Sequence, residues 1–132
     1  MQGASQGIYH GRGLDRWNFN YRSADYIKSL VEWLKKNPEK KIFFYVHIPF
    51  CEQLCWFCTC SKFITKSYEP VKAYLPYLYK EIDMLFQLLN ENNIKLNVGT
   101  VFFGGGSPTI LNRDDLKFLV NKLKKSFDWS NV

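Results

Sequence analysis

The residues best suited to chemistry lie in one short segment, which holds all four cysteines of the chain: Cys51, Cys55, Cys58 and Cys60. The first three have the spacing C-x3-C-x2-C. Three thiolates this close together can bind three corners of a cubane iron–sulfur cluster, which leaves the fourth iron without a protein ligand. Such an iron can bind a further molecule. A disulfide framework would instead join distant segments, so the clustering favours metal binding in a reducing compartment.

Two other interpretations of the cysteines stay open. A structural zinc site usually takes paired ligands from two separated segments, and this sequence has no second pair. Cys58 and Cys60 are separated by a single residue, which would also strain a tetrahedral shell. The cysteines could instead hold no metal, although a free structural cysteine normally lies in the core rather than in a loop.

The second segment of interest is the glycine run at 104–108, Gly-Gly-Gly-Ser-Pro, which follows a short apolar stretch. Glycines after a strand let backbone amides and carbonyls approach a ligand closely, because no side chain stands in the way. The plainer interpretation is an ordinary turn from a strand to a helix. In parallel α/β proteins the functional loops gather at the carboxyl ends of the strands. We therefore expect the cysteine loop and the glycine loop to face each other.

The elements that position these loops can be predicted from apolar periodicity. A first helix is indicated by helical spacing of Ile27, Leu30, Val31 and Leu34. It should end near Asn37. The run at 42–48 is apolar apart from His47 and predicts a short strand buried on both faces. The cysteine segment then forms a loop up to about Glu69.

A second helix is predicted from one apolar face, made of Tyr74, Leu78, Ile82, Leu85 and Leu89. We place its start near Leu75, because Pro76 would cost a backbone hydrogen bond inside a helix and is tolerated in a first turn. A second strand follows at 98–103. Asn112 should cap a third helix, whose apolar stripe comprises Leu116, Leu119, Val120 and Leu123.

This order of elements predicts an α/β fold with a parallel sheet. Two parallel strands cannot cover both faces of a sheet, so we interpret the 132 residues as the N-terminal part of a longer protein. Residues 1–40 would form an arm and a helix, the arm at 1–20 being flexible or dependent on a partner. Residues 41–132 would begin a larger domain, and we expect little activity from them in isolation.

Composition narrows the class of protein and its partners. Hydrophobic residues make up 46% and charged residues 23%, which is typical of folded domains. The net charge of +6 favours anionic partners. The lysines lie at predicted helix ends without interleaved aromatic residues, so we expect no nucleic-acid partner. There is neither a long apolar run nor a signal-like N-terminus, which predicts a cytoplasmic protein without a membrane partner.

Three motifs in combination resemble radical S-adenosylmethionine enzymes. They are Tyr-Val-His-Ile-Pro-Phe-Cys at 45–51, the cysteine spacing with Phe57 before its third member and Cys60 after it, and Gly-Gly-Gly-Ser-Pro-Thr-Ile-Leu at 104–111. Within that group the sequence is similar to the oxygen-independent coproporphyrinogen III oxidase family, from about Lys41 into the third helix. The resemblance implies a partial (βα)6 barrel similar to a TIM barrel, of which the first two βα units are present.

The resemblance also implies cofactors and their ligands. A [4Fe-4S] cluster would be bound by Cys51, Cys55 and Cys58. The amino and carboxylate groups of S-adenosylmethionine would chelate its open iron, and Cys60 would be a spectator. The positions that match S-adenosylmethionine contacts are Tyr45, Phe57, Gly105, Gly106 and Ser107. No catalytic residue is assigned, and for His47 we favour a structural hydrogen bond.

The implied reaction is the oxidative decarboxylation of coproporphyrinogen III to protoporphyrinogen IX without oxygen, a step of haem biosynthesis. The implied partners are an anionic porphyrinogen and a reduced electron donor such as flavodoxin or ferredoxin, and the full-length protein is expected to be a monomer. A related radical enzyme or a haem chaperone of the same family is the first alternative, because Thr59 stands where the oxidases usually have glycine. An inactive fragment and a small zinc-binding interaction module are the others.

Overall fold

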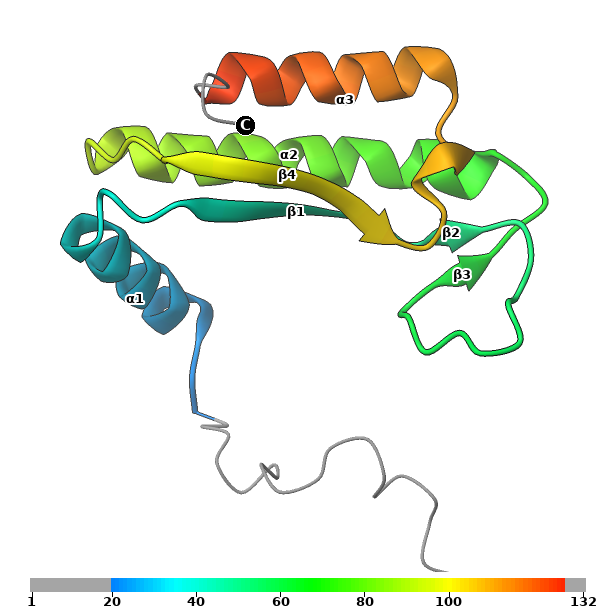
Figure 1. Ribbon diagram of the computed structural model, residues 1–132, viewed down its shortest axis with the longest axis horizontal. Helices are drawn as coiled ribbons and strands as arrows, with labels where there is room; N and C mark the ends of the chain where they lie inside the picture. Colours follow the sequence, from blue (N-terminus) through cyan, green and yellow to red (C-terminus); the bar gives the residue numbers. More distant parts are fainter. Residues whose placement is uncertain (1–19, 128–132) are drawn as a thin grey trace, which may run out of the picture.

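The computed structural model describes residues 20–127, so the predicted arm at 1–20 lies almost wholly outside the described residues. Figure 1 shows the elements in order along the chain. They are α1 (Ser23–Lys36), β1 (Ile42–Ile48), β2 (Phe50–Cys51), β3 (Phe63–Ile64), α2 (Glu69–Glu91), β4 (Val98–Gly105), the 3-10 helix η2 (Pro108–Ile110) and α3 (Arg113–Ser126).

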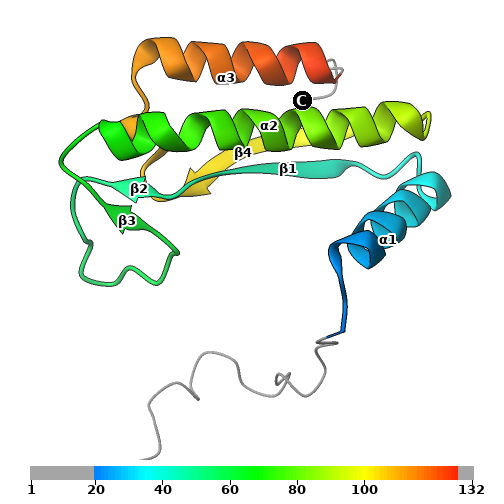
Figure 2. The same ribbon diagram turned by 180° about the vertical axis from the view of Figure 1, so that it is seen from behind.

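The main sheet consists of β1 and β4, which pair in parallel from Ile42 opposite Val98 to Ile48 opposite Gly105. α2 and α3 both lie on one side of this sheet, as the two opposite views in Figures 1 and 2 show. The predicted α/β class with parallel strands joined through a helix is therefore confirmed. Because the strands are parallel, the loops that follow β1 and β4 leave from the same end of the sheet.

The core lies between the sheet and the two helices. Alternate residues of β1 point into it, namely Phe44, Val46 and Ile48. The buried helix residues that meet them are Val71, Leu75, Leu78, Ile82, Leu119 and Leu123. The residues between them on β1 are more exposed, with Phe43 at 61% and Tyr45 at 46%. The expectation that β1 is buried on both faces is wrong, because the helices cover only one face of the sheet.

The start of α2 differs from the sequence prediction. The helix begins at Glu69 rather than near Leu75, and Pro76 lies inside it. Pro70 occupies the first turn, where its fixed φ favours helix initiation and its missing N–H costs nothing. Pro76 is exposed, so the carbonyl that loses its helical partner there faces toward water.

The cysteine segment is more ordered than a plain loop. Phe50–Cys51 and Phe63–Ile64 form a small parallel pair of strands at the base of the segment. The N–H groups of Phe63 and Thr65 donate to the carbonyls of Pro49 and Cys51, at 2.6 and 2.9 Å. The segment therefore leaves and returns at one place, directly after β1.

The first and third helices agree with the sequence prediction. α1 ends at Lys36 with Asn37 as its C-cap, and in α3 the side chain of Asn112 accepts a hydrogen bond from the N–H of Asp115 at 2.8 Å. Leu34 is the buried residue of α1, and an open apolar groove of about 470 Å³ along β1 and α2 is lined from this helix by Tyr26, Leu30, Trp33 and Leu34. The packing of α1 is thus less complete than that of α3.

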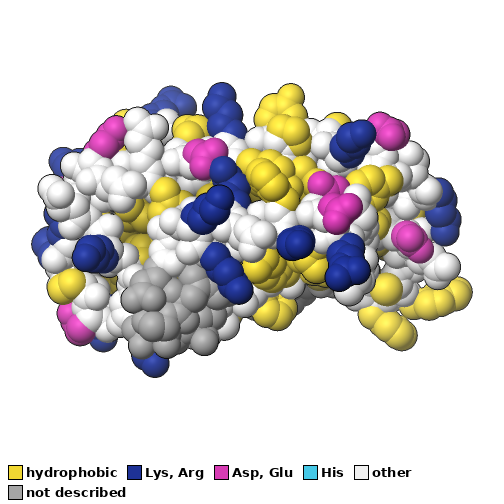
Figure 3. Space-filling view, turned by 90° about the horizontal axis from the view of Figure 1, so that it is seen from above, with side chains coloured by type: hydrophobic (Ala, Val, Ile, Leu, Met, Phe, Trp, Pro, Cys, Tyr) yellow, Lys and Arg dark blue, Asp and Glu magenta, His cyan; other side chains and the backbone are white. Residues whose placement is uncertain are grey.

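The face of the molecule formed by α2 and α3 carries side chains of both charges (Figure 3). Figure 3 shows Lys and Arg side chains interspersed with acidic and apolar side chains over this face. An ion pair of 2.5 Å between Lys122 and Asp83 joins α3 to α2. This distribution is typical of solvated helix faces. Within residues 20–127, no helix has the length and apolar character needed to cross a membrane.

The core packing predicts the stability effect of two leucines on one helix. Leu119 is fully buried, whereas Leu116 is 38% exposed. We expect Leu119→Ala to lower the free energy of unfolding by about 3 kcal/mol, and Leu116→Ala to lower it by less than about 1 kcal/mol. Urea unfolding followed by circular dichroism measures both. Equal losses in the two variants would contradict the assignment of α3 to the core.

Candidate functional site

The cysteine loop and the glycine loop lie side by side at the carboxyl ends of β1 and β4. The N–H of Gly106 donates to the carbonyl of Ile48 at 2.7 Å, and the N–H of Ser107 donates to that of Phe50 at 2.8 Å. The Ser107 hydroxyl lies 3.7 Å from the sulfur of Cys51, with the geometry of a hydrogen bond from oxygen to sulfur. The predicted juxtaposition of the two loops is confirmed.

Two glycines are required by this close approach. A Cβ atom on Gly106 would lie 2.3 Å from the carbonyl oxygen of Phe50, a backbone atom that cannot turn away. Gly105 has φ +102°, and a Cβ there would also lie 2.6 Å from the ring of His47. The packing of the two loops thus demands glycine at both positions without any ligand. Contact with a ligand would be an additional use of this half-buried backbone.

Tyr45 and His47 form a small polar group beneath the glycine loop. The Tyr45 hydroxyl lies 3.1 Å from His47 Nδ1, and His47 Nε2 lies 3.2 Å from the carbonyl oxygen of Ser61. Because the Ser61 carbonyl can only accept, Nε2 donates in this contact, while the Tyr45 hydroxyl can either donate or accept. Both ring nitrogens therefore have partners, as expected for a structural histidine. His47 ties the returning limb of the cysteine segment to β1.

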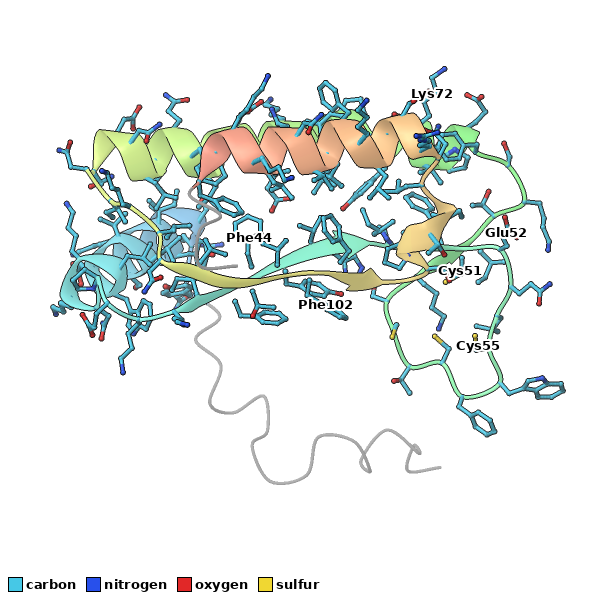
Figure 4. The ribbon with its side chains drawn as sticks, turned by 45° about the horizontal axis from the view of Figure 1, so that its top comes forward. Phe44, Cys51, Glu52, Cys55, Lys72 and Phe102 are labelled. Carbon is cyan, nitrogen blue, oxygen red and sulfur yellow. The ribbon has the colours of Figure 1, made fainter. Side chains whose placement is uncertain are left out.

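The four cysteines differ in exposure, and none of them forms a disulfide. Cys51 is buried at the end of β2, Cys58 is half-buried, and Cys55 and Cys60 are exposed. Figure 4 shows Cys51 at the base of the segment and Cys55 farther out on it. The N–H of Cys58 donates to the carbonyl of Cys55 at 3.1 Å, which places these two in one turn.

The predicted S-adenosylmethionine contacts do not all come together. Gly106 and Ser107 lie against the start of the cysteine segment, whereas Gly105 lies against the His47 ring and the Tyr45 ring borders Gly104. Phe57 is 95% exposed near the tip of the loop, next to Trp56 at 97%. The structure thus gathers one part of the predicted site at the strand ends and leaves the aromatic part open to solvent.

The local electrostatics lower the pKa of the Cys58 thiol. A backbone hydrogen bond from Cys60 has the largest effect, burial opposes it, and the nearby Lys62 ammonium lowers the pKa further. Lys62 also donates to the carbonyl of Cys58 at 3.3 Å. The thiolate is the form of cysteine that binds metals.

The residues present include the donors that an iron–sulfur cluster needs. Within residues 20–127, no three His, Cys, Asp or Glu side chains converge closely enough to hold a single metal ion. A cubane takes its ligands at separate corners and needs thiolates spread over a wider space. Free thiols on one loop, one with a lowered pKa, supply that donor set.

Two tyrosines that support the site were not predicted from the sequence. Tyr74 of α2 donates from its hydroxyl to the carbonyl of His47 at 2.9 Å. The hydroxyl of Tyr68 donates to the carboxylate of Asp115 at 2.5 Å, 47 positions away along the chain. The apolar periodicity of α2 indicates that Tyr74 faces the core, but no sequence pattern indicates the partner of either hydroxyl.

No family model matches the chain, but comparison with known sequences gives several relatives. Oxygen-independent coproporphyrinogen III oxidase from Mannheimia haemolytica is 37% identical over 115 residues, which cover 87% of this chain and 73% of that protein. The anaerobic coproporphyrinogen III oxidase 1 of Cereibacter sphaeroides is 38% identical over 101 residues, which cover 76% of this chain and 21% of that protein. A heme chaperone from Buchnera aphidicola is 32% identical over 88 residues, 67% of this chain and 22% of that protein.

Among solved structures, the chain is similar to coproporphyrinogen III oxidase from Escherichia coli, which is described as a radical SAM enzyme. The TM-score is 0.72 and the sequence identity is 28%, over 89% of this chain and 25% of that one. The chain therefore spans most of one relative and only about a fifth to a quarter of the others.

The contact between Gly106 and Phe50 predicts a stability effect at the glycine loop. We expect Gly106→Ala to lower the free energy of unfolding by about 2–3 kcal/mol, because the new methyl group overlaps the Phe50 backbone. Gly99→Ala, on β4 just before this loop, is the matched control, since its nearest atoms, at 3.1 to 3.4 Å, belong to the flexible side chain of Lys41. Urea unfolding measures both, and equal midpoints would show that Gly106 is not constrained as described.

Proposed function

Because the chain belongs to the family of oxygen-independent coproporphyrinogen III oxidases, which are radical S-adenosylmethionine enzymes, we propose that it provides the cofactor-binding part of such an enzyme. The proposed reaction is the oxidative decarboxylation of coproporphyrinogen III to protoporphyrinogen IX. The observation that carries this proposal is the contact of the glycine loop with Cys51, through Ser107 at 3.7 Å. It sets the Cys51 thiol beside the backbone of the glycine loop at the strand ends, where α/β enzymes bind their ligands.

The proposed ligands of a [4Fe-4S] cluster are Cys51, Cys55 and Cys58. When bound, the cluster supplies the electron with which S-adenosylmethionine is cleaved so that hydrogen can be removed from a substrate carbon. Cys51 is held by the strand pair at the base of the segment, whereas Cys55 and Cys58 lie in one turn farther out. A ligand set with one fixed thiol and two on an open turn leaves room for the cluster to be inserted.

The proposed contacts to S-adenosylmethionine are Tyr45, Phe57, Gly105, Gly106 and Ser107. The glycines leave backbone groups free of side chains next to Cys51, and Ser107 has a hydroxyl that can donate. Tyr45 keeps its ring at 46% exposure on the open face of the sheet. The exposed ring of Phe57 offers a flat apolar surface for a nucleoside.

The proposed partners follow from the charge and from the electron requirement. An anionic porphyrinogen suits a chain with a net charge of +6. A reduced flavodoxin or ferredoxin would supply electrons, in the cytoplasm. A heme chaperone role is the second candidate, favoured by the 32% identity to the Buchnera relative and by Thr59.

Substitution of single cysteines tests the ligand assignment. We expect Cys51→Ala, Cys55→Ala and Cys58→Ala each to lose the iron–sulfur absorbance after anaerobic reconstitution, and to lower S-adenosylmethionine cleavage more than ~100-fold, because a cubane with two protein ligands is not retained. Cys60→Ala is the matched control in the same loop and should keep both. Loss of the cluster in Cys60→Ala but not in Cys58→Ala would contradict the assignment.

The reaction itself is tested by product analysis of anaerobically purified protein. With coproporphyrinogen III, S-adenosylmethionine and a reductant, the oxidase proposal predicts 5′-deoxyadenosine together with release of carbon dioxide from the substrate. Binding of haem without either product would instead support the chaperone role. Zinc without inorganic sulfide in the purified protein would contradict both.

A further inference from the structure

A hydrogen-bonded group outside the cofactor ligands connects the far ends of the two loops. Tyr68 is the last residue before α2, where the cysteine segment ends, and Asn112 is the last residue before α3, where the glycine segment ends. The Tyr68 hydroxyl donates to Oδ2 of Asp115 at 2.5 Å and accepts from the backbone N–H of Asn112 at 3.2 Å. One phenol therefore contacts both the capping residue and the first turn of α3.

The three residues Tyr68, Asn112 and Asp115 are each hydrogen-bonded to the other two. The Asn112 side chain donates to the same Asp115 oxygen at 2.8 Å, and its own oxygen accepts the N–H of Asp115, also at 2.8 Å. Asp115 is partly buried, and a carboxylate at the first turn of a helix is favoured by the helix dipole. Burial and the hydrogen bond to Asp115 raise the pKa of Tyr68 to about 12, so the hydroxyl remains a donor at any physiological pH. A phenol that donates to a carboxylate makes one of the stronger hydrogen bonds found in proteins.

Without this group, the two loops would be joined at one end only. Near the strands they are linked by the bonds from Gly106 and Ser107 to the first limb of the cysteine segment. The returning limb, after Ile64, has no such bond to the glycine segment before Tyr68 among the contacts of the described residues. Tyr68 thus sets the position at which the returning limb meets the start of α3.

We propose that Tyr68, with Asn112 and Asp115, is a positioning group that holds the cysteine loop and the glycine loop at the spacing needed to bind S-adenosylmethionine. The inference rests on the proposed function, because it assumes that the two loops bind that cofactor together. Tyr68 makes no cofactor contact itself. It acts through the backbone of both segments, so its loss should weaken cofactor binding while the cluster ligands remain intact.

A neighbouring tyrosine provides a matched control. Among residues 20–127, the buried hydroxyl of Tyr79 has no hydrogen-bond partner. Its ring packs on Phe118 of α3 at 4.8 Å between centroids, a contact that phenylalanine would keep. Tyr68→Phe and Tyr79→Phe each remove one phenolic oxygen near the contact between α2 and α3. Only Tyr68→Phe removes hydrogen bonds that connect the two segments.

The test compares these two variants after anaerobic reconstitution. For Tyr68→Phe we expect unchanged iron and sulfide content, a KM and an equilibrium-dialysis Kd for S-adenosylmethionine raised roughly tenfold, and a kcat within about twofold at saturation. The change that S-adenosylmethionine causes in the EPR spectrum of the reduced cluster should need correspondingly more ligand. Tyr79→Phe should leave all of these values unchanged. Asp115→Asn keeps an acceptor but loses the charge, so we expect an intermediate increase in Kd.

Three outcomes would overturn the proposal. They are an unchanged Kd in Tyr68→Phe, an equal increase in Tyr68→Phe and Tyr79→Phe, and loss of the cluster together with cofactor binding in Tyr68→Phe. If Tyr68→Phe does not fold, an unchanged Kd in Asp115→Asn overturns it as well. Wild-type protein that binds no S-adenosylmethionine would instead contradict the proposed function, so the two failures can be told apart.

Discussion

The structure depends above all on the close backbone contact between two loops at one end of a parallel strand pair. Gly106 lies against the backbone of Phe50, where no other residue would fit, and Ser107 reaches the sulfur of Cys51. This contact exists because β1 and β4 are parallel and adjacent, so that both loops must leave at the same edge. This contact places the glycine loop beside Cys51, while the β2–β3 pair and His47 hold the rest of the cysteine segment to β1.

α2 supports this contact from the helix-covered face of the sheet (Figures 1 and 2). It starts where the cysteine segment ends and covers the sheet along its full length, as Figures 1 and 2 show. Tyr74 donates to the carbonyl of His47 from within the helix, and Tyr68 joins the start of the helix to Asp115. α2 therefore contributes both to the core packing and to the hydrogen bonds that position the two loops.

Part of the fold follows from the sequence. The strand at Ile42–Ile48 was predictable from its apolar run and the cap at Asn112 from its residue type, but the continuous run did not indicate that only one face of the strand is buried. The start of α2 was not predictable. The hydrogen bond that Pro76 cannot make indicates a first turn, but Pro76 lies inside the helix on its exposed side. The position of both loops after parallel strands predicted that they meet. The bond between Tyr68 and Asp115 joins residues far apart in sequence, and no local pattern encodes it.

The central claim is that three thiolates from one loop bind a cubane and leave one iron free for S-adenosylmethionine. Mössbauer spectroscopy of protein reconstituted with iron-57, recorded with and without S-adenosylmethionine, tests this most directly, because the ligand should alter one iron site only. The account predicts that about a quarter of the signal changes on addition. A cluster spectrum that does not respond, or a response shared equally by all the iron, would contradict it.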